Sequence, residues 1–131
     1  MGSTIDLRPE TLRHAIEAAD DGIYITDPRG TILFANRSIL EISGYREDEF
    51  VGRRTSIFRS GEMSDAYYRR LWNTVNSGRV WREIIVNRRK SGEAYQASQT
   101  ITPVLDAGGE IEVFIAVQRE ITRQRELEAE L

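Results

Sequence analysis

The feature that most constrains this 131-residue chain is its last third, where three strand-like runs are separated by two tight turns. The runs cover residues 80–90, 93–104 and 110–122, and the turns carry the sequences KSGE and DAGGE. Short glycine-containing turns of this kind join neighbouring antiparallel strands. The pattern therefore predicts three consecutive antiparallel strands, and any fold assigned to the chain must contain them.

Sequence parity divides these runs into two faces, because side chains alternate along a strand. One face is apolar and needs a cover; it consists of Val80, Ile84, Val86, Val113, Ile115, Val117 and Ile121. The other is mixed and consists of Trp81, Glu83, Ile85, Asn87, Tyr95, Ala97, Gln99, Ile101, Phe114, Ala116 and Gln118. Buried amides need partners, so we expect Asn87, Gln99 and Gln118 to pair with one another, with water or with a polar ligand. Aromatic walls with a few convergent amides are typical of a small-molecule pocket, and parity puts Trp81 and Asn87 on its wall.

The rest of the chain supplies helices and one more hairpin. Apolar residues at helical spacing after Pro9 predict an amphipathic helix over residues 9–20. A type I turn at residues 27–30 predicts a hairpin, and short helices follow up to Gly52. Asn36 and Ser64 are the expected caps of a short and a longer helix. Helices grouped in the middle, with hairpins at both ends, indicate an α+β fold in which short helices pack on one face of a five-stranded antiparallel sheet.

Composition narrows the class of function. The net charge of −3 argues against general binding to nucleic acid or to an anionic membrane. No apolar run approaches the ~20 residues of a membrane span, and we expect a cytoplasmic protein. The chain has no cysteine, which excludes disulfides, thiolate metal sites and thiol catalysis. No nucleophile–base pair or carboxylate dyad stands at a fixed spacing, so the sequence predicts a binding module rather than an enzyme.

The order of elements and several stretches resemble those of PAS domains. ANRSILEISGYREDEFVGR is similar to the first half of the family's pattern, and NRRKSGEAY with ITPVLDAGGEIEVFIAVQREIT is similar to the second. The resemblance covers about residues 10–125. It implies an N-terminal cap helix over residues 9–20, a PAS core over 21–122 and the start of a C-terminal signalling helix over 123–131. Residues 1–8 are expected to be a tag or linker.

Light-sensing LOV domains are one flavin-binding group of this family. They carry a cysteine that forms a photoadduct with the flavin, and Thr55 stands at its place in GRRTSIFR. Ser56 stands where that group uses an arginine for the FMN phosphate. Asn87 and Gln118 match two amides for the flavin ring, whereas Ala97 replaces a third. The resemblance therefore implies no cysteine-based photocycle and disfavours FMN.

The FAD-binding redox-sensing PAS domains, such as those of nitrogen-fixation regulators and aerotaxis receptors, are the more similar group. Their helix-to-strand segment resembles YYRRLWNTVNSGRVWREIIVNRRKSG. Glu83 departs from their pattern, because a small residue is usual there and parity points the carboxylate inward. The resemblance implies a flavin, FAD before FMN, with these cofactor-binding residues: Asn87, Gln118, Trp81, Thr55, Trp72, Gln99 and Ala97.

The same residues also have structural interpretations. Trp72 and Trp81 are often core residues, Asn87 and Gln118 can tie strands together, and Thr55 can cap a short helix. Two classes of function therefore stay open. One is a flavin-holding sensor that relays a redox or light state. The other is a dimerisation and relay module of a sensor kinase or cyclase, which binds no ligand or another small molecule.

Neither haem nor a metal is expected. His14, the only histidine, lies in the N-terminal helix, outside the central helices in which haem-binding PAS domains place their ligand. The basic residues Arg88–Lys90 are expected to form a solvated hairpin end.

Two expectations concern partners and output. The apolar face and the helix at 9–20 predict a symmetric homodimer. The tail TRQRELEAEL is rich in helix formers, and Leu127 and Leu131 have the spacing of a beginning coiled coil. In the family this segment leads to a downstream effector. If flavin binds, we expect Gln118 to rotate its amide at the polar edge of the ring on reduction and so to shift the tail.

Overall fold

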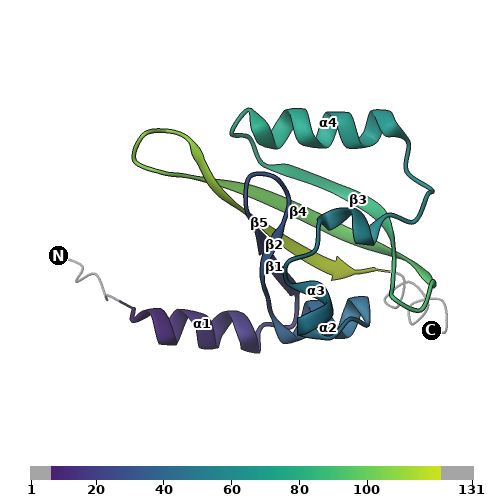
Figure 1. Cartoon of the computed structure of the whole chain (residues 1–131), viewed down its shortest axis with the longest axis horizontal. Coiled ribbons are helices and arrows are strands. Elements are labelled where there is room, and N and C mark those ends of the chain that lie inside the picture. Colours follow the sequence, from purple (N-terminus) through teal and green to yellow (C-terminus); the bar gives the residue numbers. More distant parts are fainter. Residues whose placement is uncertain (1–6, 122–131) are drawn as a thin grey trace.

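The computed structural model describes residues 7–121 of the chain. One antiparallel sheet has the strand order β2-β1-β5-β4-β3 (Figure 1). The strands are β1 (Gly22–Thr26), β2 (Ile32–Ala35), β3 (Trp81–Arg88), β4 (Ala94–Leu105) and β5 (Ile111–Glu120). The predicted α+β class and the single five-stranded sheet are confirmed. The expected signalling helix at 123–131 lies outside the described residues.

The helices are α1 (Pro9–Ala18), α2 (Arg37–Ser43), α3 (Glu47–Phe50), the 3-10 helix η1 (Thr55–Phe58) and α4 (Asp65–Asn76). The predicted caps hold, because the Asn36 side chain accepts from the Ile39 N–H and Ser64 Oγ accepts from the Tyr67 N–H. Tyr67, Leu71 and Val75 form the buried stripe of α4, which packs over β3 and β4. None of the helices within residues 7–121 is long and apolar enough to cross a membrane.

Residues 52–60, called here the cross-sheet segment, run from one edge of the sheet to the other. At the β2 edge, Gly52 N–H donates to the Ile32 carbonyl at 2.7 Å and Ile32 N–H donates to the Arg53 carbonyl at 2.9 Å. At the β3 edge, Arg59 forms an isolated bridge with Asn87, and Ser60 Oγ donates to the Val86 carbonyl at 2.8 Å. The segment therefore covers the mixed face with η1 at its centre.

The hairpin end at Arg88–Lys90 is fastened to four other segments rather than simply solvated. Arg88 donates to the carbonyls of Arg59 and Ser60 in the cross-sheet segment. Arg89, whose side chain is 19% exposed, donates to the Ile42 carbonyl at the end of α2 and forms an ion pair with Glu120 at the end of β5. Lys90 forms an ion pair with Glu49 of α3. The partners of these three residues lie 28 to 47 residues away in sequence, so the local sequence did not indicate the contacts.

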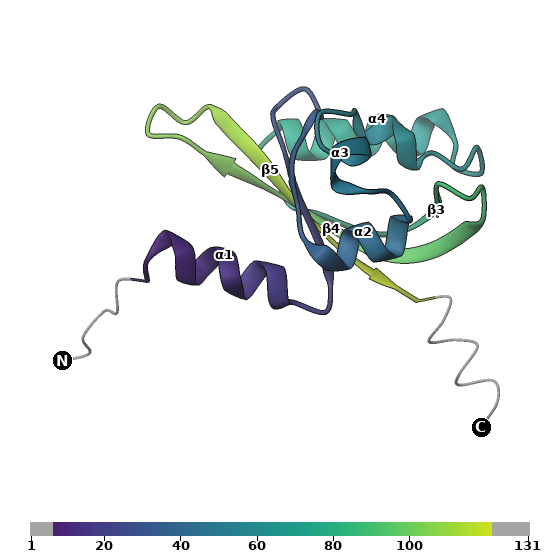
Figure 2. The ribbon, with the colours of Figure 1, turned by 60° about the horizontal axis from the view of Figure 1, so that its bottom comes forward.

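The helix α1 is fastened at its C-terminal end and stands away from the sheet (Figure 2). It ends at Ala18, two residues earlier than predicted, because Ala19 is extended and its carbonyl accepts from Ser38 Oγ at 2.6 Å. Asn36 Nδ2 donates to the Ile16 carbonyl at 2.8 Å. No residue of α1 is buried, and Leu12 is 46% exposed.

The chain enters and leaves the core at neighbouring points. β1 and β5 are paired in the centre of the sheet, and Gly22 at the start of β1 lies opposite Gln118 near the end of β5. Just outside this pair, the Arg119 guanidinium contacts both carboxylate oxygens of Asp21 at 3.1 and 3.2 Å.

Candidate ligand-binding cavity

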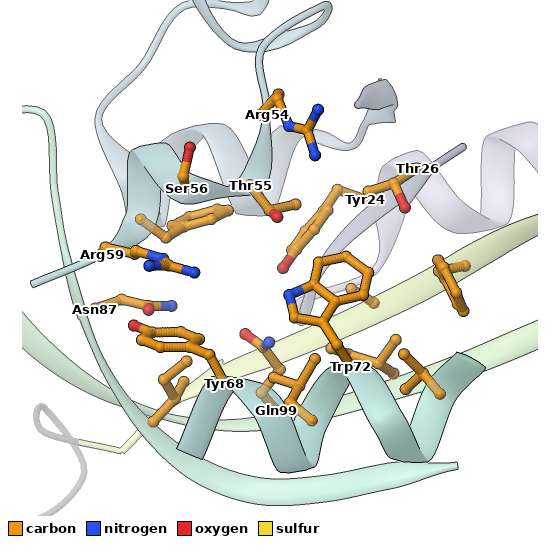
Figure 3. Close-up of a pocket in the computed structure, with 17 residues that line it drawn as sticks. Tyr24, Thr26, Arg54, Thr55, Ser56, Arg59, Tyr68, Trp72, Asn87 and Gln99 are labelled. Carbon is orange, nitrogen blue, oxygen red and sulfur yellow. The ribbon is translucent and has the colours of Figure 1, made fainter. Parts of the chain in front are cut away.

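A cavity of about 160 Å³ lies between the mixed face of the sheet, α4 and the cross-sheet segment (Figure 3). Its walls include five aromatic side chains, Tyr24, Phe58, Tyr68, Trp72 and Phe114. Polar side chains also line it: Thr26, Arg54, Thr55, Ser56, Arg59, Asn87 and Gln99. The mixture of aromatic walls and a few polar groups that the mixed face predicts is present, and it is suited to a planar ligand with a polar edge.

Asn87 carries the clearest sign of a ligand. Its side chain is 1% exposed and lines the cavity, yet neither its Oδ1 nor its Nδ2 has a hydrogen-bond partner within residues 7–121. The Tyr68 hydroxyl, which also lines the cavity, is buried and unpartnered in the same way. A buried polar group left without a partner costs about 1–3 kcal/mol, so each such group requires an explanation.

Gln118 has the opposite environment. It is fully buried behind the cavity wall, where its Oε1 accepts from the Tyr95 hydroxyl at 2.9 Å and its Nε2 donates to Gln99 Oε1 at 2.8 Å. Burial raises the pKa of the Tyr95 phenol. The Tyr95 hydroxyl donates its one hydrogen to Gln118, and Gln118 donates to Gln99, so these two amides have protein partners. The Asn87 amide has none within residues 7–121 and is left for another partner.

The structure divides the seven predicted site residues into two groups. Thr55, Trp72, Asn87 and Gln99 line the cavity. Trp81, Ala97 and Gln118 are buried but do not line it. Trp81 packs edge-to-face on Tyr67, with ring centroids 5.4 Å apart, so the expectation that Trp81 forms the pocket wall is wrong. Thr55 is the first residue of η1 rather than its cap, a position that Arg54 takes.

The expected inward carboxylate of Glu83 is also wrong. Glu83 is exposed and does not line the cavity, although it shares the parity of Trp81 and Ile85. β3 is an edge strand, and a side chain on the inner face of an edge strand can reach solvent past the border of the sheet. The departure of Glu83 from the flavin-binding pattern therefore does not obstruct the cavity.

Several lining residues were not among the predicted site residues, including Tyr24, Tyr68, Arg54 and Arg59. Parity in the first hairpin could have indicated Tyr24, and the position of Tyr68 beside the apolar stripe of α4 could have indicated Tyr68. Arg54 and Arg59 lie in the cross-sheet segment, whose sequence has no period. The Arg59 guanidinium stacks on the Tyr68 ring at 4.0 Å from its centroid.

An antiparallel sheet whose helix-covered face encloses a cavity defines a class of small binding modules. The pattern of the family described as the PAS fold matches residues 10–121, and the chain belongs to that family. It is 29% identical to the nitrogen fixation regulatory protein of Klebsiella oxytoca, covering 99% of this chain and 26% of that protein. It is 30% identical to a blue-light-activated histidine kinase of Brucella abortus (strain 2308), covering 90% of this chain and 27% of the kinase. The chain thus spans about a quarter of the length of these relatives.

Solved structures show the same fold. An RNA-binding light-oxygen-voltage receptor superposes with a TM-score of 0.83 at 22% identity, covering 90% of this chain and 34% of the receptor. The LOV protein of Rhodobacter sphaeroides superposes with a TM-score of 0.78 at 20% identity, covering 87% of this chain and 67% of that protein. In the described part of the chain, no cluster of three or more His, Cys, Asp or Glu stands ready to hold a metal ion.

Proposed function

We propose that this domain is a sensor that holds a flavin in the cavity and relays the redox or light state of the flavin to a downstream module. The observation that carries the proposal is the Asn87 amide, which is buried, has no hydrogen-bond partner within residues 7–121 and is directed into a cavity with aromatic walls. A flavin ring has broad apolar faces and one edge of alternating donors and acceptors, and an amide side chain offers both kinds of group to that edge. The named relatives, a nitrogen fixation regulator and a blue-light-activated kinase, support a sensory role.

The size of the cavity sets a condition on this fit. Its volume of about 160 Å³ is below the ~300 Å³ at which ligand pockets begin, so a flavin ring requires a wall to move outward. Arg59, Tyr68 and Trp72 line both the cavity and an adjoining surface groove. An outward shift of the Trp72 side chain would join the two spaces, with room for the ring inside and a long tail in the groove. This continuity, together with Ser56 in place of a phosphate-binding arginine, favours FAD over FMN.

Each part of the site has a distinct role in this proposal. The bound flavin supplies redox chemistry and visible absorption. Asn87 and Gln99 would hold the polar edge of the ring, and Tyr24 and Trp72 would pack on its faces. Thr55 and Ser56 lie at the cross-sheet segment, where the ring passes to its tail.

A relay route leads from the cavity to the end of β5. Gln99 lines the cavity, Gln118 bonds to Gln99, and Tyr95 bonds to Gln118. Arg89 stacks over the Tyr95 ring at 4.5 Å and is paired with Glu120. A rotation of the Gln99 amide would force Gln118 to exchange its own donor and acceptor, so the route can convert a change on the ring into a change at residue 120. A kinase, cyclase or other effector beyond this chain, in the cytoplasm, would receive it.

Absorption spectroscopy of the purified chain mixed with FAD, FMN and riboflavin tests the proposal. Bound flavin should show bands near ~370 and ~450 nm, because the spectrum belongs mainly to the cofactor. Asn87→Leu should weaken binding at least tenfold, on the order of one lost hydrogen bond to a buried group. Asn76→Leu, a matched change at the exposed end of α4, should not. Absence of binding by the wild-type chain, or equal binding by Asn87→Leu, would refute the proposal.

The alternative is a relay module without a ligand, and the small volume of the cavity is the observation that favours it.

Both functions are compatible with a homodimer, which we also propose. The outer sheet face and α1 leave apolar side chains half-exposed: Leu12, Val80 and Ile84. A protein that stays colourless with all three flavins, yet remains dimeric, would favour the alternative.

A further inference from the structure

The charge of the cavity is opposite to the charge of the chain. The whole sequence has 21 acidic and 18 basic residues, which gives a net charge of −3. Among the described residues, the side chains that line the cavity include two arginines, Arg54 and Arg59, and no carboxylate. A cleft lined by charge of one sign concentrates ligands of the other sign, so the cavity is built for an anion or for a group that becomes one.

The two arginines differ in what they already bind. Arg54 Nη2 donates to the Arg29 carbonyl at 2.7 Å. The Arg59 guanidinium stacks on Tyr68 and forms no ion pair with any residue in 7–121, including Asp65, which shares the adjoining groove with it. Its positive charge is therefore available to the cavity.

Arg59 lies at the same end of the cavity as the two unpartnered polar groups. Figure 3 shows Arg59, Asn87 and Tyr68 one beside the other on one side of the space. Within residues 7–121 the Asn87 amide and the Tyr68 hydroxyl are buried donors without acceptors, and the guanidinium adds a positive charge beside them. We call this group of three side chains the cationic end.

We infer that the cationic end holds the acceptor-rich edge of the flavin ring and stabilises the negative charge that this edge gains on reduction. The inference rests on the proposed function. If flavin is bound, its reduction would bring two electrons from an added reductant and one proton from water into the ring. The second proton would stay in solution, because the Arg59 guanidinium would compensate the negative charge of the reduced ring. Arg59 thereby sets the redox poise at which the sensor switches.

The test is a reductive titration with dithionite of flavin-loaded wild type, Arg59→Gln, Arg59→Lys and Arg82→Gln. Arg59→Gln should shift the equilibrium at least tenfold toward the oxidised form, which is about 30 mV for a two-electron couple. It should also change the uptake from one proton to two per reduction, read from the pH dependence of the potential. Arg59→Lys should retain most of the wild-type potential. Arg82→Gln removes the same charge from the exposed face of β3 and should shift the equilibrium less than about twofold.

Weak binding by a variant does not prevent the measurement. The ratio of dissociation constants for oxidised and reduced flavin gives the same quantity by linkage. Flavin binding with an unchanged potential and proton count in Arg59→Gln would overturn the inference and leave the proposed function standing. Failure of the wild-type chain to bind any flavin would overturn both.

Discussion

Asn87 and Gln118 carry the same amide group in opposite environments. Gln118 has protein partners for its oxygen and its nitrogen, whereas Asn87 has none within residues 7–121. Gln118 therefore stabilises the ligand-free protein. Asn87 lowers the stability of the ligand-free protein, and a ligand that bonds to its amide can recover that free energy. This difference can be measured on the protein without any cofactor.

Gln118→Leu should lower the free energy of unfolding by about 2 kcal/mol, because it leaves the Tyr95 hydroxyl and Gln99 Oε1 buried without partners. Asn87→Leu should be neutral or stabilising by up to about 1 kcal/mol, because it removes an unsatisfied group. Urea unfolding of both variants measures the contrast. Equal losses in the two variants would contradict it.

Tyrosine burial predicts a loss of stability at high pH. Burial raises the pKa of Tyr24 and Tyr95 above the ordinary value of 10.0. Below that pH both states keep their protons and the contribution is intact. Above it the unfolded chain releases protons that the folded chain retains, so stability should fall by about 1.4 kcal/mol per pH unit for each tyrosine. Urea unfolding above pH 10.0 should show a shallower fall in Tyr95→Phe than in the wild type, and identical slopes would refute this account.

Parity predicted which residues face the helices but not which of them reach the cavity. Asn87 and Gln99 line the cavity, whereas Trp81, Ala97 and Gln118 share their face and lie outside the cavity lining. Whether a side chain on this face reaches the cavity depends on what packs above its strand. Trp81 is covered by the Tyr67 ring, which comes from α4, 14 residues earlier in the sequence. Local sequence carries no information about that cover.

The same limit applies to whole elements: the sequence predicts those that depend on neighbouring residues and not those that depend on distant contacts. Strands, hairpin turns and helix caps were predictable, because each depends on neighbours in sequence. The cross-sheet segment was not, because its shape is fixed by bonds to both edge strands. The clamp formed by Arg88–Lys90 was interpreted as solvated for the same reason.

Arg89 is the central residue of that clamp. Arg89→Met should lower the free energy of unfolding by about 2–3 kcal/mol, because it breaks the contacts to Ile42 and Glu120 at a largely buried position. It should also speed hydrogen exchange at the Ile121 amide, which donates to the Gln96 carbonyl beside this ion pair. Arg82→Met on the exposed face of β3 is the control. A wild-type exchange rate at Ile121 in Arg89→Met would exclude Arg89 from the route to the tail.

At the scale of the whole molecule, one face of the sheet has no cover from other elements within residues 7–121. Ile84 and Val80 are each 49% exposed, and no residue of α1 is buried. Within a single copy of the described chain, α1 contacts α2 and the Phe34 ring but leaves most of its surface free. A second copy supplies a cover of the same composition, which is the basis for a symmetric dimer.

Light scattering should therefore give the mass of a dimer for the wild-type chain. Ile84→Glu combined with Leu12→Glu should give a monomer, since each change buries a carboxylate in the interface. Asn76→Glu at the exposed end of α4 should leave the mass unchanged. A wild-type chain that stays monomeric at high concentration, with α1 folded by circular dichroism, would rule out the dimer.

The pairing of Gly22 with Gln118 has a consequence for how such a domain can be moved between proteins. Neighbouring strands lie ~4.8 Å apart, so the two ends of the core are separated by little more than one residue's reach. A host chain can be opened at a surface loop and the core spliced in without separating the cut ends of the host. For the same reason a short peptide can join the ends of the core, and new termini can be opened at the turn at 106–109 between β4 and β5. Such a circular permutant should retain the cavity, because the residues that line it lie outside that turn.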